Sequence, residues 1–164
     1  GANGVGKSRF MELLRRAMLE GETIPGLTAS PSLAVGYLDK HMSQLPPAQT
    51  PQDFITTRFR LGDQRSLSLL AGAGFDLATQ RRPIERLSGG QKSRLGLLAL
   101  RLETPNFYLL DEPTNHVDIA GQEALEAEIL AHEASCVLVS HDRFFVRAVG
   151  TRIWNIEDQK LREE

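Results

Sequence analysis

Apolar residues recur along the chain at two spacings, and these spacings predict helices that alternate with short strands. Between residues 7 and 19 they fall three and four positions apart, as on one face of a helix. The apolar positions there are Phe10, Leu13, Leu14, Ala17 and Met18. A second helix is predicted over residues 91–102, and shorter helices are predicted over residues 52–60 and 66–73.

Continuous apolar runs predict buried strands over residues 33–38, 107–110 and 136–139. Near the end of the chain, residues 153–156 and 160–161 flank a turn at Asp158-Gln159, and Trp154 is expected to pack in the core. A cluster of prolines follows the first strand, at Pro46, Pro47 and Pro51, and marks a boundary. We therefore expect an α/β core with an inserted helical subdomain of about residues 45–86.

Composition narrows the class of protein only a little. The 164 residues suffice for one domain with a core, and the net charge of −2 gives no sign of a strongly basic nucleic-acid surface. No apolar stretch reaches the ~20 residues that a membrane-spanning helix needs. The chain opens without Met and without an apolar signal segment, so further sequence is expected upstream.

The first eight residues match the phosphate-binding pattern G-x-x-x-x-G-K-[ST] in full. They are Gly1, Ala2, Asn3, Gly4, Val5, Gly6, Lys7 and Ser8. Glycines let successive backbone N–H groups turn inward at a helix start and hold a phosphate. Lys7 would reach the outer phosphates, and the Ser8 hydroxyl could bind Mg²⁺. The alternative is a glycine-rich turn that only caps the helix.

The predicted strand over residues 107–110 runs directly into two adjacent carboxylates, Asp111 and Glu112. A buried strand that ends in this way would deliver both groups to the edge of a sheet. One carboxylate could hold a metal ion, and the other could act as a general base.

A second glycine-rich helix start lies at residues 87–91. Ser88, Gly89, Gly90 and Gln91 precede the helix predicted over residues 91–102. A hydroxyl and flexible backbone at a helix N-terminus can bind an anion. The alternative is a helix cap made by Ser88, and both interpretations can hold together.

Together these motifs resemble the ATP-binding-cassette (ABC) ATPase domain, in that family's order and over essentially the whole chain. Residues 1–8 are similar to its Walker A motif, residues 87–91 to its signature and residues 109–112 to its Walker B. The stretch Ser140-His141-Asp142-Arg143 is similar to its switch region. The resemblance implies a P-loop NTPase-type, mostly parallel sheet flanked by helices, in a cassette that lacks its N-terminal β subdomain.

The subfamily indicated is the ABC-F class, whose members are soluble and carry two cassettes in one chain. The residues that carry this resemblance are Asn115-His116-Val117-Asp118 and Arg143-Phe144-Phe145. Residues 87–92, with Arg94, are more similar to the second cassette than to the first. The resemblance implies a cytoplasmic ATPase without membrane insertion that acts on the ribosome in translation or antibiotic resistance.

The resemblance also assigns roles to single residues, with ATP and Mg²⁺ as cofactors. Ser8 and Asp111 would hold the metal, Glu112 would be the general base and His141 would contact the γ-phosphate. The signature residues Ser88, Gly89, Gly90 and Gln91 would meet ATP bound to a second cassette, in the same full-length chain or in a dimer. Asp118 would lie at that interface.

Two other functions and one departure from the family pattern stay open. The chain could be the ATPase subunit of an ABC membrane transporter, or an inactive fragment or interaction module. The family's glutamine after the first strand aligns with Lys40, whereas Gln44 lies four residues later. Either residue could take the glutamine's place beside the metal. His41 between them is expected to be an exposed loop residue.

Overall fold

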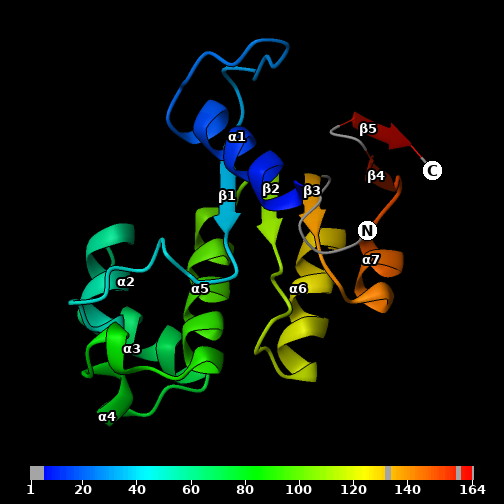
Figure 1. The fold of residues 1–164 in the computed structure, drawn as a ribbon. Helices are drawn as coiled ribbons and strands as arrows, with labels where there is room; N and C mark the ends of the chain where they lie inside the picture. The colour runs from blue at the N-terminus through cyan, green and yellow to red at the C-terminus, as the bar shows by residue number, and fades with distance from the viewer. Residues whose placement is uncertain (1–5, 132–133, 158–159, 164) are drawn as a thin grey trace.

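The computed structural model describes residues 6–131, 134–157 and 160–163 and has a three-stranded parallel sheet at its centre (Figure 1). The strands are β1 (Val35–Leu38), β2 (Phe107–Asp111) and β3 (Ser135–Val139), and β2 lies in the middle. In register, Val35 lies opposite Phe107, and Phe107 lies opposite Ser135. The predicted fold class, an α/β fold with a parallel sheet flanked by helices, is confirmed.

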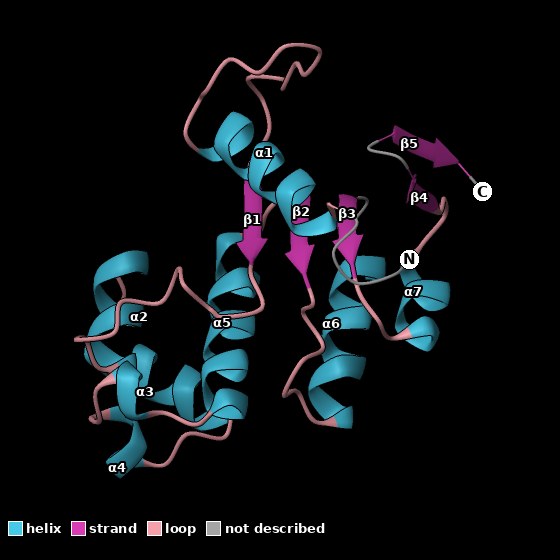
Figure 2. Ribbon diagram, viewed as in Figure 1, coloured by secondary structure: helices cyan, strands magenta, loops and turns pink. Residues whose placement is uncertain are grey.

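Helices cover both faces of this sheet (Figure 2). Helix α1 (Lys7–Leu19) packs Met11 and Leu14 against Leu109 on one face. The other face carries α5 (Gly89–Glu103) and α6 (Ile119–Ala131), together with Phe145 of α7 (Arg143–Val149). The chain therefore builds three layers, with the sheet in the middle.

Strand β2 is apolar at every position before Asp111 because both of its faces are covered. Leu109 faces α1, whereas Tyr108 and Leu110 face the core beneath α5 and α6. All three side chains are fully buried. Successive side chains of a strand point to opposite faces, so a strand between two helical layers needs an unbroken apolar run.

Short helices occupy the chain between β1 and α5. They are α2 (Pro51–Phe59), α3 (Asp63–Gly72), α4 (Leu77–Gln80) and a 3₁₀ turn (Ile84–Arg86). Thr50 and Asp76 start α2 and α4 by accepting hydrogen bonds from backbone N–H groups. Phe54, Ile55, Leu70 and Phe75 join the core that α5 borders. These helices lie within the region where the sequence predicts an inserted helical segment.

Helix α5 lies between that region and the sheet, and it contacts both. The Arg94 guanidinium lies over the Phe75 ring, 5.7 Å from its centroid. On the other side, a Cβ atom on Gly36 would lie 2.5 Å from Leu100 Cδ1. Glycine at position 36 therefore lets β1 approach α5 closely.

Three features differ from the sequence-based expectations. Helices α6 and α7 are absent from the predicted elements, and the exposed Ile119, Leu130 and Phe144 explain why their apolar pattern is weak. Trp154 was expected in the core, but it is 48% exposed. It lies on β4 (Trp154–Glu157), which pairs with β5 (Lys160–Glu163) as a separate two-stranded sheet. The predicted turn at residues 158–159 lies outside the described residues.

Within the described part of the chain, no helix combines the length and apolar character required to span a membrane.

Candidate nucleotide-binding site

A cavity of about 530 Å³ opens where the carboxyl ends of the three strands meet the start of α1. Its lining residues come from all four elements or the turns beside them. They are Gly6, Lys7, Ser8, Arg9, Lys40, Asp111, Glu112, Asn115, Val139 and His141. Open α/β sheets bind ligands at this edge because the loops after parallel strands meet there.

The start of α1 forms one side of the cavity. Gly6 caps the helix with φ 104°, in the left-handed region that glycine adopts without strain. Lys7 and Ser8 form the first turn, where the backbone N–H groups of a helix start and the helix dipole favour an anion. The predicted site residues Gly1, Ala2, Asn3, Gly4 and Val5 lie outside the described residues.

Two carboxylates form the wall at the end of β2. Asp111 and Glu112 are each only 7% exposed. Burial raises the pKa of Asp111, and the Lys40 ammonium opposes this rise more than any other charge around it. Burial disfavours the charged form of this carboxylate, and a bound cation would stabilise that form.

Glu112 is held in an unusual conformation by the next strand. Its φ of 52° lies in the left-handed region, which costs a residue with a side chain about 1–3 kcal/mol. Its backbone N–H donates to the Val139 carbonyl oxygen at 2.7 Å. This bond turns the chain directly after Asp111 and brings the Glu112 carboxylate to the end of β3.

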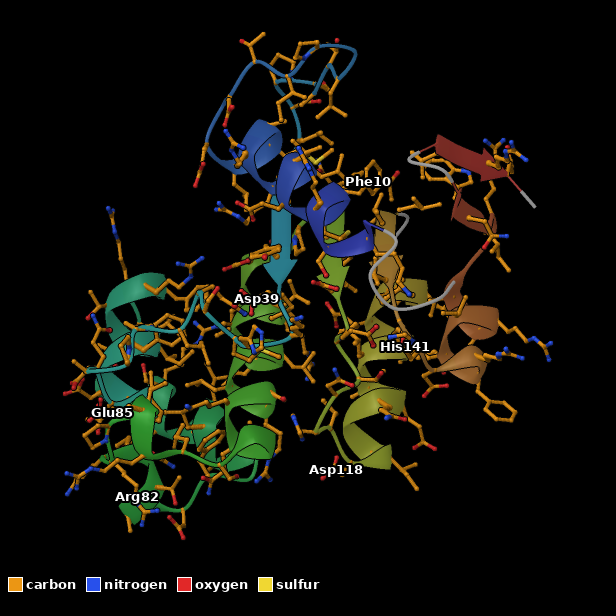
Figure 3. All side chains as sticks on the ribbon, in the orientation of Figure 1. Phe10, Asp39, Arg82, Glu85, Asp118 and His141 are labelled. Atoms are coloured by element: carbon orange, nitrogen blue, oxygen red, sulfur yellow. The ribbon has the colours of Figure 1, made fainter. Side chains whose placement is uncertain are left out.

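His141 meets that carboxylate with both its backbone and its ring. The His141 N–H donates to Glu112 Oε2 at 3.1 Å, and its Nε2 lies 3.4 Å from Glu112 Oε1. The side chain of His141 is 61% exposed, so the ring borders the cavity's solvent (Figure 3). Asp142 follows and accepts from two N–H groups at the start of α7, which fixes the turn.

The signature residues lie away from the cavity. Ser88 caps α5 and forms a capping box with Gln91, so the predicted helix cap is confirmed. Ser88 and Gly89 are exposed, and so is Asp118 beyond the loop after β2. None of the predicted residues at positions 88–91 and 118 lines the cavity.

The signature nevertheless contacts the loop that follows Glu112, at Asn115 and His116. The Ser93 hydroxyl donates to the carbonyl oxygens of Gly89 at 3.1 Å and Asn115 at 3.2 Å. A Cβ atom on Gly89 would lie 3.3 Å from the His116 ring. Ser93 and Arg9 stand outside the sequence motifs, and Asn115 belongs to the stretch that indicates the ABC-F class, with no site role predicted for its side chain.

Lys40 lines the cavity, whereas Gln44 does not. The turn after β1 places Met42 at φ 53°, and Gln44 Nε2 lies 3.5 Å from Met42 Sδ. Gln44 Nε2 also lies 3.6 Å from the position of a Cβ on Gly96, in the middle of α5. Gln44 therefore points to α5. His41 is exposed, as expected.

Comparison with known proteins supplies the family. A family model described as "ABC transporter" matches residues 1–115. The chain is 35% identical to ATP-binding cassette sub-family F member 3 of Mus musculus, over 96% of this chain and 22% of that protein. It is 33% identical to the ribosome protection protein VmlR of Bacillus subtilis, over 89% of this chain and 26% of that protein. It spans about a quarter of such relatives.

A solved structure agrees with the fold. It is a dimeric ATP-binding cassette in a post-hydrolysis state, bound to ADP and Pi, with a TM-score of 0.71 and 20% identity. The match covers 100% of this chain and 82% of that one. The predicted resemblance to an ABC-F cassette is confirmed by these relatives. The chain belongs to the ABC transporter family and forms an ATPase domain of the ATP-binding-cassette type.

Proposed function

We propose that this chain binds and hydrolyses ATP as part of an ABC-F-type protein. One observation carries the proposal: the Glu112 carboxylate is buried at the cavity wall and accepts the His141 N–H, opposite the first turn of α1. This arrangement puts a candidate base and a candidate phosphate-binding helix start in one cavity.

Four of the cavity residues then have defined tasks. Lys7 and the N–H groups of the loop before it bind the phosphates, and Ser8 binds a metal ion. Glu112 accepts a proton from the attacking water, and His141 orients Glu112 and reaches the γ-phosphate. Both groups belong to adjacent strand ends, so their positions depend on the sheet and not on a long loop.

The donor set fits Mg²⁺. The described residues contain no group of three or more His, Cys, Asp or Glu side chains that could cage a metal. Mg²⁺ prefers one or two protein oxygens and completes its shell with phosphates and water, as Ser8 and Asp111 would allow. When bound, Mg²⁺ neutralises charge on the phosphates.

The exposed signature residues favour a composite site with a second cassette. Ser88, Gly89 and Asp118 are exposed to solvent and do not line the cavity of their own domain. We propose that Ser88, Gly89, Gly90 and Gln91 bind the ATP held by the second cassette, and that Asp118 contacts that cassette. We further propose that residues 45–86 form one helical subdomain of a partial cassette spanning residues 1–164.

The cellular role proposed is a cytoplasmic one on the ribosome, in translation or antibiotic resistance. The names of the relatives support it, since one is a ribosome protection protein and another belongs to sub-family F. These matches do not favour the transporter alternative. Cosedimentation with ribosomes in the presence of ATP tests this part. No cosedimentation with ribosomes in the presence of ATP would contradict it.

The test of ATP binding is Lys7→Ala in the natural polypeptide that contains residues 1–164. We expect ATP affinity and hydrolysis to fall together, because the ammonium that contacts the outer phosphates is lost. Arg65→Ala removes an exposed cation on α3 and is the control. Wild-type ATP affinity in Lys7→Ala would overturn the phosphate-binding assignment.

A further inference from the structure

We infer that Lys40 binds the γ-phosphate of ATP and gives this cassette a metal-independent preference for ATP over ADP. The inference rests on the proposed function and adds a residue to it. It concerns the turn after β1, where Lys40 stands in the place of the glutamine of the family pattern.

The turn that carries Lys40 borders the cavity and is fixed by Asp39. The Asp39 carboxylate accepts hydrogen bonds from the N–H groups of His41, at 2.7 Å, and Ser43, at 3.1 Å, and also from the Ser43 hydroxyl. Asp39 is thus engaged within the turn. Figure 3 shows Asp39 beside the end of β1, at the same edge of the sheet as His141.

Lys40 lies at the carboxylate end of the cavity. Leu38 at the end of β1 lies opposite Leu110 of β2, so the turn that carries Lys40 follows β1 beside Asp111. Lys40 lines the same cavity as Glu112 and His141. If Glu112 and His141 act on the γ-phosphate, then a group beside Asp111 faces that phosphate as well.

The chemistry of lysine then decides what it does there. A glutamine can offer a carbonyl oxygen to a metal ion, but an ammonium has three donors and no acceptor. Lys40 therefore cannot take the metal-binding task, and Gln44 points to α5 instead. An ammonium in a cavity that receives phosphates forms a charge-assisted hydrogen bond to a phosphate oxygen. ADP lacks the phosphate that Lys40 would reach.

The experiment measures ATP and ADP affinities of the natural polypeptide in EDTA, which removes Mg²⁺ and stops metal-dependent hydrolysis. In Lys40→Gln, we expect ATP affinity to fall about tenfold or more and ADP affinity to change less than about twofold. Lys40→Arg keeps the charge and should retain most of the preference for ATP. Arg65→Gln, an equal charge change on α3 away from the cavity, should behave as the wild type.

The outcomes separate the two hypotheses. Equal losses of ATP and ADP affinity in Lys40→Gln, or no loss, would overturn the assignment of Lys40 while leaving ATP binding intact. A loss in Lys40→Arg as large as that in Lys40→Gln would also overturn it, because the positive charge would then not be the cause. Binding by the wild type with Mg²⁺ but not in EDTA would overturn the role of Lys40 alone, whereas failure to bind either nucleotide with Mg²⁺ would overturn the proposed function as well.

Discussion

The backbone carbonyl oxygen of His116 lies 3.0 Å from the place that a Cβ atom on Gly90 would occupy. This contact joins the signature to the loop that leaves Glu112. His116 itself has φ 61°, so the loop is already in a conformation that few side-chain-bearing residues adopt. Glycine at position 90 therefore has a packing role inside the domain, whatever it contacts outside.

The Gly90→Ala variant tests that role. The new methyl group would push on a backbone oxygen that cannot rotate away, so we expect a loss of about 1–3 kcal/mol in the free energy of unfolding. Urea denaturation measures it. Gly72→Ala on α3 is the control, because a Cβ there meets nothing within 4 Å. Equal stability of the two variants would contradict the packing role.

Ser93 makes the second link between the signature and this loop. It is 2% exposed, and its hydroxyl donates to the carbonyl oxygens of Gly89 and Asn115. Ser93→Ala should cost about 0.5–1.5 kcal/mol of stability, the usual net value of such bonds. Thermal unfolding measures this, with the exposed Ser68→Ala on α3 as control. A Ser93→Ala midpoint equal to that of the control would show that the link is not stabilising.

Cys136 offers a probe of unfolding through its pKa. Burial raises the pKa of its thiol from near 9 to about 12. Because the thiolate reacts and the thiol does not, iodoacetamide at pH 8 should label Cys136 in the folded protein at least about a hundredfold more slowly than in urea. Mass spectrometry follows the reaction. Equal rates would contradict the protection of the partly buried Cys136 in the folded state.

The same shift gives a pH dependence with a definite sign. The folded state holds the Cys136 proton more tightly than the unfolded state does. This contribution to stability is complete below about pH 9 and is lost as the pH rises towards 12. A Cys136→Ala variant should lack this component of the alkaline loss. An identical loss in the wild type and the variant would contradict it.

The sequence predicted much of the fold because its strands are buried on both faces. Residues 107–110 form an unbroken apolar run between two helical layers, and helix α1 has the predicted bounds. Helix α6 carries Ile119 and Leu130 on its exposed side, so its apolar residues do not follow a clear helical spacing. Trp154 was misjudged because the hairpin that carries it pairs apart from the main sheet.

The sequence predicted the site residues whose side-chain type and motif together indicate a chemical role. Lys7, Asp111, Glu112 and His141 line one cavity, as their motifs suggest. The choice between Lys40 and Gln44 was not predictable, because it depends on the left-handed conformation of Met42. The contact of Ser93 with Asn115 likewise joins residues 22 positions apart in sequence.

The most direct test of the account is steady-state ATP hydrolysis by Glu112→Gln in the natural polypeptide with Mg²⁺. The amide preserves shape but cannot accept the proton from water, so turnover should fall about a hundredfold to ten-thousandfold while ATP stays bound. Glu123→Gln, an exposed residue of α6, should hydrolyse ATP at the wild-type rate. Glu112→Gln turnover within twofold of the wild type would contradict the assignment of Glu112 as the general base.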